Sequence, residues 1–131
     1  MSEENVKVVL GALEAWNAGD MDRLSALCDP DAIVRAPPDW PEPGPFIGRE
    51  AIMRQFSQMR EAFDSNNLEQ LSDFLTAGDR VLVRFAWKVA GQGPAVEVAW
   101  TFVYTVRRGL IYGLEYIPDH EEALKAAGLS G

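Results

Sequence analysis

The hydrophobic residues of this chain follow a helical period in its first half and a strand-like pattern in its second half. Before the turn at 64–67, apolar side chains recur at spacings of three and four residues, as in amphipathic helices. After that turn, alternation along uncharged stretches is typical of β-strands. Helices followed by a run of strands predict an α+β fold, with the helices packed on one face of the sheet.

Four helices are predicted from the spacing and the capping residues. The first covers 3–17, a short second one follows the capping residue Asp20, and a third covers 49–63. The last begins at Asp119, and Glu122 three residues later completes a capping box. No internal repeat or low-complexity linker separates these elements, so we expect one domain over residues 1–131.

The second half of the chain predicts an antiparallel meander. Short connections that contain glycine separate its strands, and such connections join antiparallel neighbours. A short earlier strand lies between the second and third helices. The predicted strands are 32–36, 68–76, 81–90, 95–106 and 110–117.

The strand at 95–106 has one bulky face and one small face. The bulky face carries Trp100, Phe102 and Tyr104, whereas Glu97 and Thr101 belong to the small face. We expect the helices to cover the small face. A bulky apolar face is too large to remain in water, so we expect a second copy of the chain to cover it in a homodimer.

Charge and apolar run lengths exclude two classes of partner. Lys and Arg number 12 against 20 Asp and Glu, a net charge of −8, and no basic stripe is present, so nucleic acid is not an expected partner. The longest apolar stretch, 98–106, is too short to span a membrane. The lone Cys28 and the absence of an export signal predict a cytoplasmic protein.

Several short stretches resemble the SnoaL-like proteins, relatives of polyketide cyclases and ketosteroid isomerases in the nuclear transport factor 2-like superfamily. The stretches are Ala15-Trp16-Asn17-Ala18-Gly19-Asp20, Asp29-Pro30-Asp31-Ala32, Gly48-Arg49-Glu50-Ala51-Ile52, Val103-Tyr104-Thr105 and Asp119-His120-Glu121-Glu122-Ala123-Leu124. The resemblance implies a cone in which a strongly curved, mostly antiparallel sheet wraps the helices and leaves a pocket. It also implies homodimers that pair through the outer face of the sheet.

Aligned on this resemblance, the ketosteroid isomerase machinery is absent. Ala36 stands at the position of the base, Thr101 at that of the protonated acid, and Ala12 near that of the tyrosine. Alanine cannot transfer a proton, and threonine is a poor substitute for a neutral carboxylic acid.

The predicted pocket wall lies on the faces where helices and sheet meet. Its residues are either ordinary core or a ligand-binding wall, and periodicity does not separate the two. They are Trp16, Trp40, Phe56, Met59, Phe85, Trp87, Thr101 and Leu114.

Three residues are candidates for acid–base chemistry. Asp39, beside Trp40 in a proline-rich segment, lies either over the pocket mouth or in an exposed loop. Glu97 points either into the pocket, where a carboxylate can act as acid or base, or into solvent. Tyr116 directs its hydroxyl either into the pocket or into water at the edge of the core.

No metal or organic cofactor is expected. His120 is the only histidine, no cluster of metal ligands is visible, and no glycine-rich loop precedes a helix that would bind phosphate. The sequence therefore predicts a protein that binds or converts a small, largely apolar molecule, by isomerase, cyclase or hydrolase chemistry if it is catalytic. The alternative is a non-catalytic dimeric binding or interaction domain with a filled pocket. A carboxylate inside the cavity separates the two, because an all-apolar interior argues against catalysis.

Overall fold

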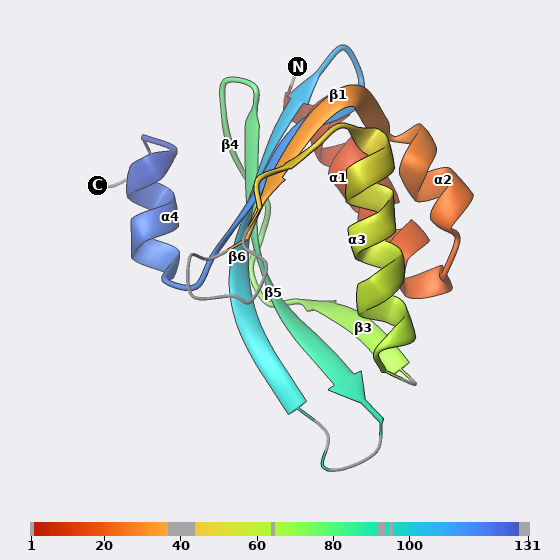
Figure 1. The fold of residues 1–131 in the computed structure, drawn as a ribbon. Coiled ribbons are helices and arrows are strands. Elements are labelled where there is room, and N and C mark those ends of the chain that lie inside the picture. Colours follow the sequence, from red (N-terminus) through yellow and green to blue (C-terminus); the bar gives the residue numbers. More distant parts are fainter. Residues whose placement is uncertain (1, 37–43, 64, 92–93, 95, 129–131) are drawn as a thin grey trace.

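The computed structural model describes residues 2–36, 44–63, 65–91, 94 and 96–128, which form helices around a strongly curved sheet (Figure 1). The helices are α1 (Ser2–Ala18), α2 (Met21–Ala26), α3 (Arg49–Glu61) and α4 (His120–Ala126). The strands are β1 (Cys28–Arg35), β2 (Phe46–Ile47), β3 (Ser65–Gln70), β4 (Leu75–Ala77), β5 (Arg80–Ala90), β6 (Val96–Arg107) and β7 (Leu110–Ile117).

Within the described residues, these strands form one seven-stranded sheet in the order β2-β1-β7-β6-β5-β3, and β4 also pairs with β5. Only the pair of β1 and β7 is parallel there, and the other pairs are antiparallel. The helices α1, α2 and α3 lie on the concave side of the sheet (Figure 1). The predicted α+β cone is confirmed. None of the described helices is long and apolar enough to cross a membrane.

The predicted strand at 68–76 is in fact two strands, β3 and β4. The chain between them turns at Leu71, whose amide donates to the carbonyl of Arg84 over 2.7 Å, and the Ser72 hydroxyl accepts from the Arg84 amide over 2.9 Å. These two bonds satisfy the backbone of Arg84 where neither strand continues, so the interruption costs the sheet little.

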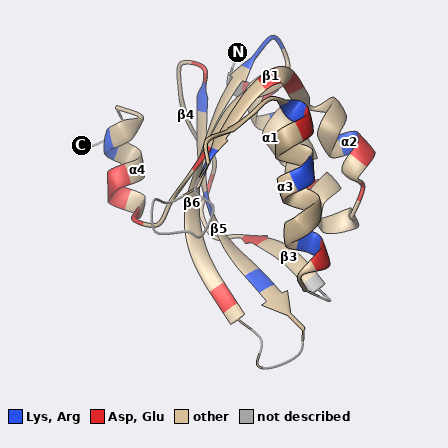
Figure 2. Ribbon diagram, viewed as in Figure 1, with Lys and Arg blue, Asp and Glu red and all other residues tan. Residues whose placement is uncertain are grey.

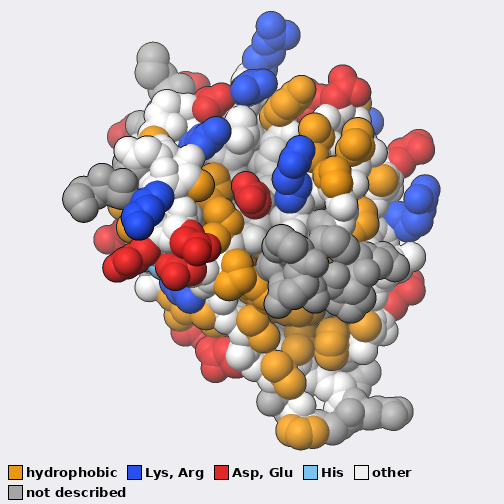
Figure 3. Space-filling model, turned by 60° about the vertical axis from the view of Figure 1, so that its left-hand side comes forward, with side chains coloured by type: hydrophobic (Ala, Val, Ile, Leu, Met, Phe, Trp, Pro, Cys, Tyr) orange, Lys and Arg blue, Asp and Glu red, His pale blue; other side chains and the backbone are white. Residues whose placement is uncertain are grey.

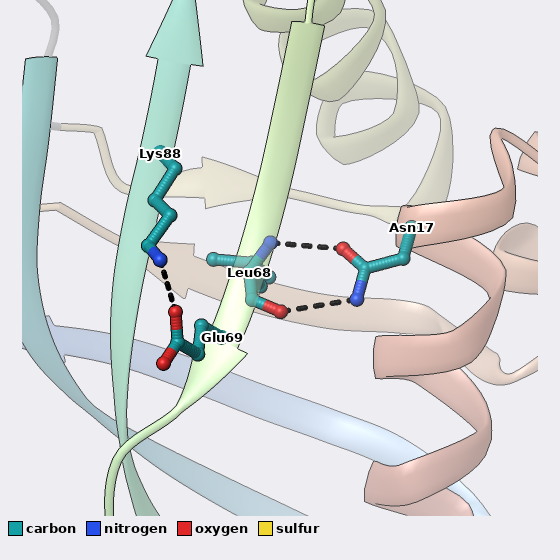
Figure 4. Close-up of polar contacts among 4 residues, drawn as sticks. All are labelled: Asn17, Leu68, Glu69 and Lys88. Atoms are coloured by element: carbon teal, nitrogen blue, oxygen red, sulfur yellow. Dashed lines mark hydrogen bonds and ion pairs between the residues drawn. The ribbon is translucent and has the colours of Figure 1, made fainter. Parts of the chain in front are cut away.

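Asn17 joins the end of α1 to the edge strand β3. Its side-chain amide accepts from the Leu68 amide over 2.8 Å and donates to the Leu68 carbonyl over 3.0 Å (Figure 4). The residue after Leu68, Glu69, forms an ion pair with Lys88 of β5. The two contacts fix β3 on both of its edges, to the helix on one side and to β5 on the other.

The register of β5 and β6 reverses the predicted assignment of the two faces. Phe85 pairs with Trp100 and Val83 with Phe102, and directly opposed residues lie on the same face of a sheet. The bulky face of β6 therefore points toward α1, α2 and α3, together with Phe85. The prediction that Trp100, Phe102 and Tyr104 form the outer face is wrong, because a change of one residue in register exchanges the two faces of a strand.

Helix α4 lies on the convex side of the sheet, so the prediction that all helices share one face is wrong for this helix (Figure 1). Ala123 packs against Leu82 and Val103, which lie on the small face of the sheet. Polar contacts support this packing. Thr101 Oγ1 lies 2.8 Å from His120 Nδ1 and accepts from Arg84 Nη1 over 2.9 Å.

Thr101 is fully buried in this contact, so we expect Thr101→Val to destabilise the protein by about 1–3 kcal/mol. Valine has nearly the same shape but leaves Arg84 and His120 without their shared partner. The free energy of unfolding measured in urea checks this result. Thr105→Val is the control, because Thr105 lies on the same face of β6 but is only half-buried. Equal effects at the two positions would contradict a specific role for the Thr101 hydroxyl.

Candidate functional site

A cavity of about 760 Å³, its opening included, lies between the concave side of the sheet and α1, α2 and α3. Most of its wall is aliphatic or aromatic, and none of the described lining residues is acidic or basic. The lining residues are Ala12, Leu13, Trp16, Leu24, Cys28, Ala32, Ile33, Val34, Ile52, Phe56, Met59, Leu68, Trp87, Trp100, Phe102, Tyr104, Ile111, Leu114 and Tyr116. This apolar composition matches that of small-molecule sites.

Strand β6 explains why the wall is uncharged. Between Glu97 and Arg107 this strand carries no charged residue, as the uncoloured span in Figure 2 shows. Its aromatic residues contact those of the neighbouring strands. The ring centroid of Phe102 lies 4.9 Å from that of Phe85 and 4.8 Å from that of Tyr116. Such tilted and edge-on contacts hold the rings in fixed orientations.

On the helical side, Trp16 forms the corresponding part of the wall. Its ring meets that of Phe56 edge-on at 5.8 Å, and the Arg60 guanidinium lies 4.8 Å from the ring centroid. Arg60 Nη1 also donates to the Trp16 carbonyl over 2.6 Å. The indole N–H groups of Trp16 and Trp87 are buried and have no hydrogen-bond partner among the described residues.

Two phenols and one thiol supply polar atoms to the described wall. Burial raises the pKa of Tyr104 and of Tyr116 well above the usual value, and the nearby Cys28 raises both further. Burial also raises the pKa of the Cys28 thiol to about 11, against a smaller opposing effect of Arg49. All three groups therefore keep their protons at neutral pH and can donate hydrogen bonds there.

Most of the sequence-predicted pocket residues line the cavity. Those found in its wall are Trp16, Phe56, Met59, Trp87 and Leu114, and the candidate Tyr116 joins them. Phe85 is fully buried beside Phe102 but is not among the lining residues. Asp39 and Trp40 lie outside the described residues.

Two predicted site residues lie elsewhere. Thr101 is on the convex side under α4, and Glu97, on the same face of β6, is exposed. Their placement in the pocket was wrong because the helices were expected to cover the small face of this strand, whereas its bulky face lies on the cavity side. The opposite error missed Trp100, Phe102 and Tyr104 as wall residues.

The described residues contain no group of three or more His, Cys, Asp or Glu side chains arranged to hold a metal ion. Cys28 is separated from His120 by the sheet, since it lines the cavity whereas His120 contacts the convex side. The hydroxyls of Tyr104 and Tyr116 and the thiol of Cys28 can donate or accept hydrogen bonds in the described wall, and its other side chains supply mainly apolar contact.

We expect the stability of the protein to fall as the pH rises from about 9 to about 11. The folded state holds the Cys28 proton more tightly than the unfolded state, so this contribution is complete below pH ~9 and is lost as the thiol ionises. A pKa increase from 9.0 to about 11 corresponds to at most about 3 kcal/mol. Urea unfolding between pH ~7 and pH ~10.5 measures this loss.

The control for this prediction is Cys28→Ala, which removes the thiol. The variant should keep its stability to a higher pH. Above about pH 10 it should also lose stability, because the folded state raises the pKa values of Tyr104 and Tyr116. Identical pH profiles for the variant and the wild type would show that the thiol is not buried in the folded protein.

Comparisons with known proteins agree with this geometry. The structure of Bal32a, from a soil-derived mobile gene cassette, has 26% sequence identity and a TM-score of 0.80 over 87% of this chain and 88% of that one. A putative polyketide cyclase from Sinorhizobium meliloti has 31% identity and a TM-score of 0.69 over 84% and 93%. TerC, co-crystallised with polyporic acid, has 20% identity and a TM-score of 0.78 over 95% and 97%. No curated protein matches the chain.

The family model of the SnoaL-like domain matches residues 9–114. The match begins in α1 and ends in β7, so it includes the helices and strands that enclose the cavity. This chain belongs to the SnoaL-like family.

Proposed function

We propose that this protein binds a small, largely apolar cyclic molecule in the cavity. The observation that carries the proposal is the cavity itself, whose described wall is mostly aromatic and aliphatic and has donors but no charged side chain. Apolar walls with a few polar atoms are typical of sites for compounds of drug size. TerC, which shares the fold at 20% identity, was co-crystallised with polyporic acid.

The cavity favours ligand binding over a domain with a filled interior. It also favours binding over catalysis as far as the described wall is concerned, because that wall contains no carboxylate. Isomerase, cyclase or hydrolase chemistry needs a group that accepts a proton. No metal or organic cofactor forms part of the proposal.

A panel of steroids and polycyclic aromatic compounds tests the proposal by thermal unfolding. At a free concentration about a hundredfold above Kd, a ligand stabilises the protein by about 2.7 kcal/mol, which raises Tm by several degrees. The ligand should also slow alkylation of Cys28, the only cysteine of the chain, because this residue lines the cavity. Intact-mass measurement after iodoacetamide treatment follows the alkylation.

A pair of variants on α1 shows whether a bound compound occupies the cavity. Ala12 lines it, and Ala18 on the same helix is exposed. Ala12→Phe should fill part of the cavity and remove the increase in Tm, whereas Ala18→Phe should retain it. Binding that survives Ala12→Phe unchanged would locate the site elsewhere and refute the proposal.

Catalysis is a second candidate function, and one observation favours it. Asp39 follows Val34, a residue of the cavity wall, by five positions, and five residues span at most about 18 Å. Asp39 is therefore the carboxylate to test as an acid or base, because it follows a wall residue closely in the sequence.

We nevertheless expect no useful turnover of a 5-ene-3-ketosteroid. Ala36 and Ala12 replace a base and a donor, and Thr101 lies outside the cavity. Loss of one oxyanion donor costs about 2.7–4 kcal/mol, and loss of a general base a further factor of about a hundred. The steroid isomerisation assay on wild type and Asp39→Asn checks this. Robust turnover that Asp39→Asn abolishes would identify Asp39 as the base and overturn the expectation.

We also propose that the chain forms a homodimer through the convex side of the sheet. Ala99 of β6 lies on this side and is only partly buried, whereas Ala86, which pairs with it on β5, is already covered within the chain. Figure 3 shows this side of the molecule, where hydrophobic side chains lie among scattered acidic and basic ones. Light scattering should give twice the mass of the chain at micromolar concentration, and Ala99→Arg should halve it. A monomeric wild type would refute the dimer.

A further inference from the structure

Arg60, near the end of α3, contacts the cavity wall from its outer side. The wall includes Trp16, whereas Arg60 is not among the lining residues. The Arg60 guanidinium carbon lies over the Trp16 ring, 4.8 Å from the ring centroid, and Nη1 donates to the Trp16 carbonyl over 2.6 Å. One side chain of α3 therefore holds both the ring and the backbone of a wall residue on α1.

The orientation of the Trp16 ring depends on this contact. The indole N–H is buried and has no hydrogen-bond partner among the described residues, so no polar bond fixes the ring there. Phe56 meets the ring edge-on, with centroids 5.8 Å apart, but Phe56 also lines the cavity and meets any ligand in it. Arg60 contacts the ring from outside the cavity, so its contact is present with or without a ligand.

The surroundings of Arg60 keep its guanidinium at the ring. None of the ion pairs among the described residues includes Arg60, so no carboxylate there competes with Trp16 for it. Gly19 leaves room for the guanidinium, because an added Cβ would lie only 3.2 Å from Arg60 Nη2. The buried Asn66 donates from Nδ2 to the Arg60 carbonyl over 3.2 Å and fixes the backbone that carries the side chain.

We propose that Arg60 is a positioning residue of the cavity, whose guanidinium holds the Trp16 ring in the orientation that binds the ligand. Without this contact the ring occupies other orientations as well, and the apparent affinity falls with the fraction of molecules in the binding orientation. A cation–π contact of this kind corresponds to an effect of about two- to fivefold. The proposal rests on the proposed function, because it assumes that the cavity binds a small molecule.

A double-mutant cycle tests the proposal with N-phenyl-1-naphthylamine, an uncharged aromatic probe that fluoresces in apolar sites. Arg60→Met keeps an apolar side chain beside the ring but removes the guanidinium, and it should weaken binding about two- to fivefold. In the Trp16→Leu background, which offers no ring, Arg60→Met should leave the affinity unchanged. The hydrogen bond to the carbonyl of residue 16 is lost in both backgrounds, so it does not contribute to the difference.

Arg54→Met is the matched control for this cycle. Arg54 lies on the same helix and is exposed, so its loss should leave the affinity for the probe at the wild-type value. The control separates the contact with Trp16 from the general effect of removing one positive charge from α3.

Fluorine NMR of protein labelled with 5-fluorotryptophan reports on the ring without any ligand. The chain has four tryptophans, and the signal of Trp16 is the one lost in Trp16→Leu. Trp16→Phe gives the same assignment if Trp16→Leu fails to fold. The Trp16 signal should be a single sharp resonance in wild type and in Arg54→Met, and it should shift and broaden in Arg60→Met.

An unchanged Trp16 resonance in Arg60→Met would overturn the proposal, whatever happens to the binding of the probe. So would an equal loss of affinity from Arg60→Met in both backgrounds, which would indicate a merely structural role, or no loss at all. In each of these cases the proposed function stands, since wild type binds the probe. Failure of wild type to bind the probe would refute the proposal together with the proposed function.

Discussion

The antiparallel pairing of β5 with β6 is the contact on which the rest of the structure depends. It runs without a break from Arg80 opposite Thr105 to Val89 opposite Val96. Each pair of opposed residues places two side chains on the same face, so the aromatic residues of both strands gather on the concave side, and Arg84 and Thr101 lie on the convex side. The register of β5 with β6 therefore places the cavity wall on one face of the sheet and the contact surface of α4 on the other.

The two faces of the β5–β6 hairpin make different kinds of contact. On the concave side, bulky rings leave space between themselves and the helices, and the wall is held by edge-on aromatic contacts. On the convex side, short side chains let α4 approach, and Arg84, Thr101 and His120 bond beneath it. Aromatic residues thus line the cavity on one face of these strands, and a mixture of apolar and polar residues contacts α4 on the opposite face.

Local features of the fold were predictable from the sequence. The predicted helices 3–17 and 49–63 differ from α1 and α3 by two residues or fewer at each end, because spacing and capping act within a few residues. The Asp119 side chain accepts from the amides of Glu121 and Glu122, as expected of a capping residue. The aromatic residues of α1 and α3 were also placed correctly on the cavity side.

Features that depend on distant pairing were not predictable in this way. Both faces of β6 are largely uncharged, so alternation alone did not show which one the helices cover. The role of Cys28 in the wall depends on β1 beginning at this residue and pairing with Ile111 of β7, although Pro30 follows closely. The turn at Leu71 depends on bonds to Arg84, which is remote in sequence. A wrong choice of face exchanges residues of the cavity wall with residues of the convex face, as it did for Tyr104 and Thr101.

The amide of Asn17 has a consequence for how the molecule behaves in a crowded solution. Strand β3 ends the sheet, and a free edge offers backbone groups to any other extended chain, which is a common start of aggregation. Asn17 uses both the N–H and the C=O of Leu68 on that edge, much as a neighbouring strand would. A single side chain at the end of a helix thereby blocks the middle of β3 against invasion by a foreign strand.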